Sequence, residues 1–81
     1  MSVLDLIGDT PLVHVDGILV KVESRNPSGS IKDRLAKYIV ERETAAGRLK
    51  GGQPIVEASS GNTGIAFALV GAATGHPVVI S

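Results

Sequence analysis

A segment that is apolar nearly all round constrains this chain more than any other feature. It covers Thr63–Thr74, and the six consecutive residues at its centre, Ile65-Ala66-Phe67-Ala68-Leu69-Val70, include no polar side chain. A helix of this composition has no face for water, so we expect it to be buried on several sides. The run Pro77–Ile80 that follows lacks polar alternation, which suits a parallel strand covered on both faces by helices. Both segments predict an α/β core with more protein around it.

The remaining strands are short. Leu12–Val15 and Ile18–Val22 are rich in β-branched residues, and Asp16-Gly17 between them favours a tight hairpin turn. Pro54–Ala58 predicts a third strand. We therefore expect an α/β fold in which an amino-terminal hairpin is followed by βαβαβ-like units of an open parallel sheet.

The most regular helical pattern follows the turn-forming Asn26-Pro27-Ser28-Gly29. Its apolar residues are predicted to form one buried face, and its charged residues the opposite face. The apolar set is Ile31, Leu35, Ile39 and the neighbouring Tyr38, and the charged set is Asp33, Lys37 and Glu41. Ser30 is expected to cap the helix in a capping box with Asp33, and Gly47 to end it.

Composition and charge reduce the number of function classes that this chain can belong to. The chain has 81 residues, fewer than the ~100 to 150 of a common domain, but its 43% apolar and 20% charged residues are those of a globular core. Eight basic and eight acidic residues cancel and are interspersed, so we expect no nucleic-acid binding. Without cysteine, and with two histidines far apart in sequence, we expect no metal site.

The amino terminus indicates a compartment. It lacks a basic region followed by a long apolar run, as a secretory signal would have. The most apolar stretch, Ile65–Ala73, is shorter than the ~20 residues of a membrane span. We expect a cytoplasmic protein without a membrane segment.

Lys32 is the first candidate for chemistry. It follows a Gly-Ser turn and falls in the first turn of the predicted helix, where the helix dipole disfavours a positive charge and works to lower the pKa of the amine. A neutral amine can form a Schiff base with an aldehyde cofactor and later move a proton. On position alone, an ordinary surface lysine beside Asp33 and Arg34 remains the alternative.

The second candidate is the loop Ser59-Ser60-Gly61-Asn62-Thr63-Gly64, which joins a strand to a helix. Its backbone N–H groups, hydroxyls and amide can converge on a carboxylate or a phosphate. It is neither a P-loop nor a dinucleotide-binding glycine motif. A plain strand-to-helix turn with Asn62 as the cap is the alternative, although a loop beyond the carboxyl end of a parallel strand is a common ligand site.

Other polar residues are weaker candidates. His14 alternates with valines in a strand and His76 lies in a Gly-His-Pro turn, so both are interpreted as structural. Glu23 and Glu57 end strands near the two loops, but the sequence gives them no partner.

Taken together, the motifs resemble one family. Two motifs resemble those of the cysteine synthase and cystathionine β-synthase group of fold-type II pyridoxal-phosphate (PLP) enzymes: Asn-Pro-Ser-Gly-Ser-Ile-Lys-Asp-Arg around Lys32, followed by Ser-Ser-Gly-Asn-Thr-Gly around Asn62. The fold of this group is like that of tryptophan synthase β. The opening Ile7–Val13 resembles the amino-terminal signature of this group. The resemblance covers nearly the whole of residues 1–81, which are expected to be a truncated amino-terminal portion of the enzyme domain.

The resemblance implies roles for individual residues. Lys32 would bond the cofactor and move the proton at the substrate α carbon. Ser59, Ser60, Gly61, Asn62 and Thr63 would hold the substrate α-carboxylate, and Asn62 would also reach the 3′ oxygen of the cofactor. A glycine-rich phosphate loop and a serine at the pyridine nitrogen, which the family places further on, have no counterpart in residues 1–81.

The implied activity is β-replacement, in which an activated serine and sulfide give cysteine. PLP is the implied cofactor, an amino acid the substrate, and a homodimer the expected full-length assembly. Cystathionine β-synthase-like or serine/threonine dehydratase-like activity stays open, because nothing before Ser81 separates the nucleophiles. From another class, a non-enzymatic fragment or pairing module is also open, given an apolar helix and last strand without cover.

Overall fold

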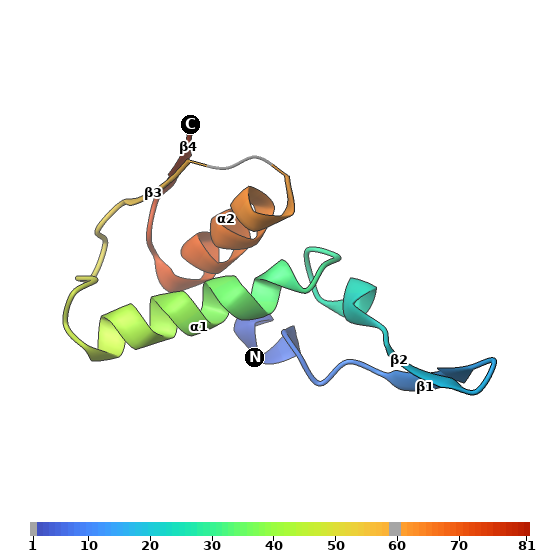
Figure 1. Cartoon of the computed structure of the whole chain (residues 1–81). Coiled ribbons are helices and arrows are strands. Elements are labelled where there is room, and N and C mark those ends of the chain that lie inside the picture. The colour runs from blue at the N-terminus through green and yellow to red at the C-terminus, as the bar shows by residue number, and fades with distance from the viewer. Residues whose placement is uncertain (1, 59–60) are drawn as a thin grey trace.

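The computed structural model describes residues 2–58 and 61–81 (Figure 1). The chain begins with a 3-10 helix, η1 (Val3–Leu6), and continues into the strands β1 (Leu12–Val15) and β2 (Ile18–Lys21). A second 3-10 turn, η2 (Glu23–Arg25), leads to the long helix α1 (Lys32–Ala45). The second half consists of β3 (Ile55–Glu57), α2 (Asn62–Thr74) and β4 (Val78–Ile80).

Strands β1 and β2 form the predicted hairpin, one residue shorter than expected. They pair antiparallel with Val15 opposite Ile18, and Asp16 and Gly17 make the turn at φ values of 49° and 80°. The hairpin projects from the helices (Figure 1), and the chain measures 46 × 26 × 21 Å. Its radius of gyration is 14.0 Å, above the ~12 Å of a compact chain of this length.

Strands β3 and β4 pair parallel, with Ile55 opposite Val78 and Glu57 opposite Ile80. Helix α2 connects them and packs on both strands and on α1. This βαβ unit confirms the predicted α/β class and element order. The parallel sheet has two strands within residues 2–58 and 61–81, and the hairpin forms a separate sheet.

The core lies between the two helices and η1. Its members are apolar residues of small to moderate size, together with one aromatic ring: Ile7, Ala36, Val40, Ala66, Phe67 and Val70. The alanines allow the helix backbones to approach closely, and Phe67 fills the remaining space. His76 is buried at the end of α2, with Nδ1 2.8 Å from the carbonyl oxygen of Gln53, in agreement with its structural interpretation.

The predicted buried face of α1 was wrong. Leu35, Ile39 and Tyr38 are 42%, 36% and 58% exposed. The buried residues of α1 are Asp33, Ala36 and Val40. The two stripes are adjacent on the helix and both contain apolar residues, so periodicity alone could not distinguish them. Ala36 lies on the buried stripe, where its small side chain is compatible with the packing of α1 on α2.

The predicted cap of α1 was also wrong. Ile31 is the N-cap and makes no side-chain capping bond, while the Ser30 hydroxyl accepts a bond of 3.2 Å from the backbone N–H of Lys32. Asp33 accepts bonds from the backbone N–H of Ser28, at 2.8 Å, and from the Ser28 hydroxyl. Its carboxylate turns to the preceding loop because that loop folds back over the first turn. Gly47, at a φ of 76°, follows the end of the helix, as predicted.

Helix α2 differs from the prediction in its first residue and in how much of its surface is buried. Asn62 is its first residue rather than its cap, because Gly61 takes the cap position with a φ of 75°. One side of α2 is buried, whereas Ile65 is 53% exposed, so burial on several sides is not seen in this chain. Likewise Val79 of β4 is 54% exposed. Neither α1 nor α2 has the length and apolar character needed to cross a membrane, nor does any other helix within residues 2–58 and 61–81.

Candidate active site

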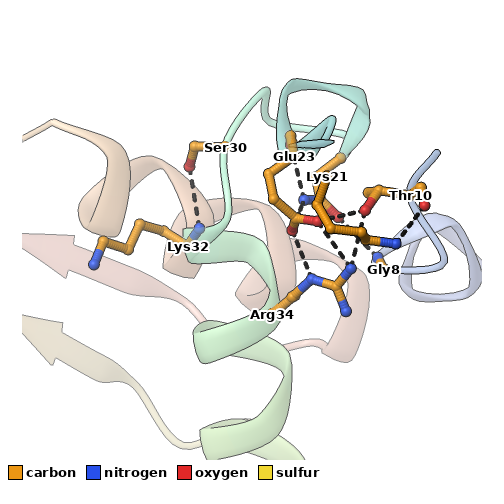
Figure 2. Close-up of polar contacts among 8 residues, drawn as sticks. Gly8, Thr10, Lys21, Glu23, Ser30, Lys32 and Arg34 are labelled. Carbon is orange, nitrogen blue, oxygen red and sulfur yellow. Dashed lines mark hydrogen bonds and ion pairs between the residues drawn. The ribbon is translucent and has the colours of Figure 1, made fainter. Parts of the chain in front are cut away.

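Lys32 is the first residue of α1 and is exposed. Its backbone is held by the hydrogen bond to Ser30, whereas Figure 2 shows its side chain extending away from the polar contacts around Glu23 and Arg34. The amine therefore stands clear of the chain's own carboxylates in that cluster. An amine in this setting is free to react with a carbonyl group supplied from outside.

The second candidate loop leads into α2. Gly61 is the N-cap, and Asn62 and Thr63 open the helix. The first backbone N–H groups of any helix lack partners within the helix, and a glycine cap offers no side chain to satisfy them. This end of α2 can therefore donate hydrogen bonds to an anion. Ser59 and Ser60, predicted to bind the same carboxylate, lie outside the described residues.

An open hollow of about 330 Å³ adjoins this end of α2. Its lining is Gly61, Gly64, Ile65, Ala68 and Ile80. A Cβ built on Gly61 would meet no atom within 4 Å, so the backbone of the loop faces free space. Because Ile80 ends β4, the hollow lies at the carboxyl end of the parallel strands, where open α/β sheets bind ligands.

The two candidate loops approach the same region. Helices α1 and α2 pack together, and in Figure 1 both run from right to left, so their amino-terminal ends lie on the same side of the molecule. Lys32 begins one helix and Asn62 the other. Within the described ranges, no hydrogen bond joins Lys32 to Gly61, Asn62 or Thr63. The packing of α1 on α2 thus brings the starts of the two helices to one side of the molecule.

A polar cluster near Lys32 was missed in the sequence. Glu23 accepts two bonds from Arg34, from Nε at 2.6 Å and from Nη2 at 3.0 Å, and further bonds from the Thr10 hydroxyl and the Asn26 amide (Figure 2). Asn26 in turn accepts a bond of 2.8 Å from the backbone N–H of Gly8. The sequence predicts Glu23 as the end of a strand and gives it no partner, whereas in the structure Glu23 begins η2. Thr10 and Arg34 lie 13 and 11 positions from Glu23, so the spacing of residues in the sequence gave no signal for these two partners.

Arg34 dominates the electrostatics of this cluster. Its guanidinium, followed by the Thr10 hydroxyl, lowers the pKa of Glu23 from 4.5 to about 2, with a smaller contribution from Asn26 and opposition from burial. The same ion pair raises the pKa of Arg34. Glu23 is therefore ionised throughout the neutral and mildly acidic range.

We expect acid to reduce the contribution of this cluster to the stability of the fold. Since the folded pKa of Glu23 is depressed, its contribution to stability is fully present above pH 4.5 and is lost as the pH falls towards 2. We expect the wild type to exceed Glu23→Gln in urea midpoint at neutral pH, and the difference to shrink between pH 4.5 and pH 2. A difference that is constant across this range would contradict the expectation. Urea unfolding of both variants followed by circular dichroism measures it.

The residues present fit a PLP cofactor and an amino-acid substrate. Lys32 offers an exposed primary amine, and the start of α2 offers anion-binding N–H groups beside an open hollow. A primary amine can react with the carbonyl group of the cofactor, and the N–H groups at a helix start can bind the carboxylate of the substrate. When bound, PLP acts as an electron sink that makes loss of a substrate α proton feasible.

Comparison with known proteins agrees with this assignment. Residues 3–81 match the family model described as pyridoxal-phosphate dependent enzyme. The chain is 51% identical to the O-ureido-L-serine synthase of Streptomyces lavendulae over 85 residues, which are 96% of this chain and 26% of that protein. It is 42% identical to cystathionine beta-synthase of Saccharomyces cerevisiae over 91 residues, 99% of this chain and 18% of the relative.

Cysteine synthase B of Pseudomonas aeruginosa is 38% identical over 87 residues, 98% of this chain and 29% of the relative. The crystal structure of O-ureido-L-serine synthase superposes with a TM-score of 0.90 at 50% identity, covering 98% of this chain and 27% of that one. The chain thus spans between 18% and 29% of the length of these relatives. The predicted resemblance is confirmed: this chain belongs to the family of pyridoxal-phosphate dependent enzymes.

Proposed function

We propose that this chain supplies the cofactor-bonding lysine and the substrate-carboxylate loop of a PLP-dependent β-replacement enzyme that makes cysteine from an activated serine and sulfide. Lys32 would bond the cofactor. Ser59, Ser60, Gly61, Asn62 and Thr63 would hold the α-carboxylate, and the Asn62 amide would also reach the 3′ oxygen of the cofactor. The observation that carries the proposal is the exposed Lys32 amine at the same side of the molecule as the open start of α2.

The names of the three relatives support the reaction class. Cysteine, cystathionine and O-ureido-L-serine share a serine-derived 2-amino-2-carboxyethyl group and differ in the substituent on its β carbon, which is attached through sulfur in the first two and through oxygen in the third. In the proposed reaction Lys32 removes the α proton, the leaving group departs from the β carbon with its electron pair, the nucleophile adds there, and Lys32 returns the proton. The shared α-carboxylate is the part that the start of α2 would recognise.

A second candidate is transfer of the same group to an oxygen nucleophile. The 51% identity to O-ureido-L-serine synthase favours it. Product analysis of the complete catalytic unit would separate the two, with sulfide and hydroxyurea offered in competition. Cysteine as the main product supports the first proposal, and O-ureido-L-serine the second.

Labelling of the chain by PLP tests the role of Lys32. The chain is incubated with PLP, reduced with borohydride, and mapped for modified lysines. We expect label to concentrate on Lys32, and Lys32→Ala to lose most of the visible Schiff-base absorbance. The matched control is Lys37→Ala, on the same helix, which should retain both. Label spread evenly over Lys21, Lys32, Lys37 and Lys50 would refute a dedicated cofactor lysine.

A further inference from the structure

Glu23 joins three segments of the chain that are separate in sequence. Its carboxylate binds Thr10 from the segment before β1, Asn26 from the end of η2, and Arg34 from the first turn of α1. We call these four residues the Glu23 junction. Thr10 and Asn26 are 7% and 3% exposed, whereas the side chains of Glu23 and Arg34 are 18% and 40% exposed, so the junction is partly buried. Charge-assisted bonds with two parallel N–H donors are among the strongest polar contacts in proteins.

The junction acts on the turn that carries Lys32. Arg34 is two residues beyond Lys32, and its backbone N–H bonds the carbonyl of Ile31 at 3.1 Å. Residues 31–34 therefore form one hydrogen-bonded turn, which cannot rotate about the helix axis without moving the Arg34 side chain. Glu23 holds that side chain on one face of the turn, and Figure 2 shows the Lys32 side chain leaving in the opposite direction.

Alternative anchors for this turn are weaker. The Ser30 hydroxyl contacts only the backbone N–H of Lys32, at 3.2 Å on the exposed surface. Asp33 bonds Ser28, which belongs to the loop directly before the helix. This bond fixes the shape of the loop but does not attach the loop to other parts of the chain. Among the hydrogen bonds of residues 2–58 and 61–81, those of the junction connect the turn to the amino-terminal segment, through Arg34 and Thr10 and through the bond from Gly8 to Asn26.

We propose that Glu23 is a positioning residue for Lys32: by holding Arg34 it fixes the rotation of the first turn of α1 and so directs the lysine amine towards the cofactor. This inference rests on the proposed role of Lys32. Its consequence is that the preference of PLP for Lys32 over other lysines depends on Glu23, which would never touch the cofactor itself.

The chain provides a matched control. Glu43 and Arg48 form a second charge-assisted ion pair, at the far end of α1 from Lys32. Glu23→Gln and Glu43→Gln each remove one carboxylate charge from one such pair, and only the first lies at the junction. Both variants are compared with the wild type below their unfolding transitions, so that the readout reports the folded state.

The first readout is the ratio of borohydride-trapped PLP on Lys32 to that on Lys37, since both lysines belong to α1. We expect Glu23→Gln to lower this ratio by about tenfold, near the lower limit for loss of a hydrogen bond to a charged group, and Glu43→Gln to leave it unchanged. A purely structural role for Glu23 would lower the unfolding midpoint without changing the ratio. An unchanged ratio in folded Glu23→Gln would therefore overturn the inference.

The second readout needs no cofactor. Amide hydrogen exchange of residues 31–34 should accelerate in Glu23→Gln and stay at the wild-type rate in Glu43→Gln. If the wild type shows no preference for Lys32, the proposed function fails, and exchange at residues 31–34 alone then decides whether Glu23 holds the turn. Equal exchange rates in both variants would overturn the positioning role.

Discussion

Replacing Gly71 with alanine is expected to destabilise this chain strongly. A Cβ at this position would overlap Cγ2 of Val78 and lie 2.8 Å from the carbonyl oxygen of His76. Both atoms belong to the connection from α2 into β4, where the backbone is already tightly bonded. The carbonyl of Gly71 accepts a bond of 2.9 Å from the His76 N–H and another from the Gly75 N–H. The contact therefore cannot be relieved by a small shift.

We expect Gly71→Ala to lower the free energy of unfolding by about 3 kcal/mol, the upper part of the range for overpacking a tight site. The better helix propensity of alanine, worth ~1 kcal/mol, offsets only part of the steric cost. A chain of this size has only ~4 to 12 kcal/mol of stability to lose. Urea unfolding followed by circular dichroism measures the change.

The matched control for this substitution is Gly51→Ala. A Cβ on Gly51 would meet no atom within 4 Å, and its backbone is not in the left-handed region. Its unfolding midpoint should stay close to that of the wild type. If Gly71→Ala and Gly51→Ala unfolded at the same urea concentration, close packing of α2 on β4 at Gly71 would be disproved.

The second large loss of stability is expected when Asp33 is replaced with alanine. Its side chain has no exposed surface, and its two carboxylate oxygens accept bonds from the N–H and the hydroxyl of Ser28. Asp33→Ala would leave both donors without their acceptor and open a small cavity next to the Ser28 loop. We expect a loss of about 2 to 3 kcal/mol, because bonds to a charged group contribute more than neutral ones. The favourable placement of a carboxylate in the first turn of a helix is lost as well.

Two further variants calibrate this result. Asp33→Asn keeps the shape and one acceptor oxygen, so it should lie between the wild type and Asp33→Ala. Glu41→Ala removes an exposed carboxylate from the same helix and should change the free energy of unfolding by no more than about 0.5 kcal/mol. Equal stability of Asp33→Ala and Glu41→Ala would show that the Ser28 loop does not depend on this carboxylate.

Asp33 and Glu23 have complementary effects on the Lys32 turn. Asp33 closes the loop that precedes Lys32 onto the helix, and Glu23 attaches the same turn to the amino-terminal segment through Arg34. The two residues that follow Lys32 are thus both anchored to segments that precede it. This arrangement anchors the backbone on both sides of Lys32 while its side chain is exposed, which suits the proposed role of Lys32.

Local features of the sequence determined the elements and their order. Asp16-Gly17 specified the hairpin because both residues tolerate a positive φ, and the turn before Ser30 together with Gly47 bounded α1 to within two residues. The motifs around Lys32 and Asn62 identified the family, because their residues and order are distinctive. These signals are local, and each is complete within a few residues of the chain.

Only the tertiary structure decided which side of each helix is buried and which polar groups meet. On α1, the stripe containing Asp33, Ala36 and Val40 is buried, whereas the more apolar stripe through Leu35 and Ile39 stays exposed. The partners of Glu23 and the close contact at Gly71 depend in the same way on segments far apart in sequence. Periodicity describes one helix at a time, and it carries no information about the shape of the surface that another element brings to it.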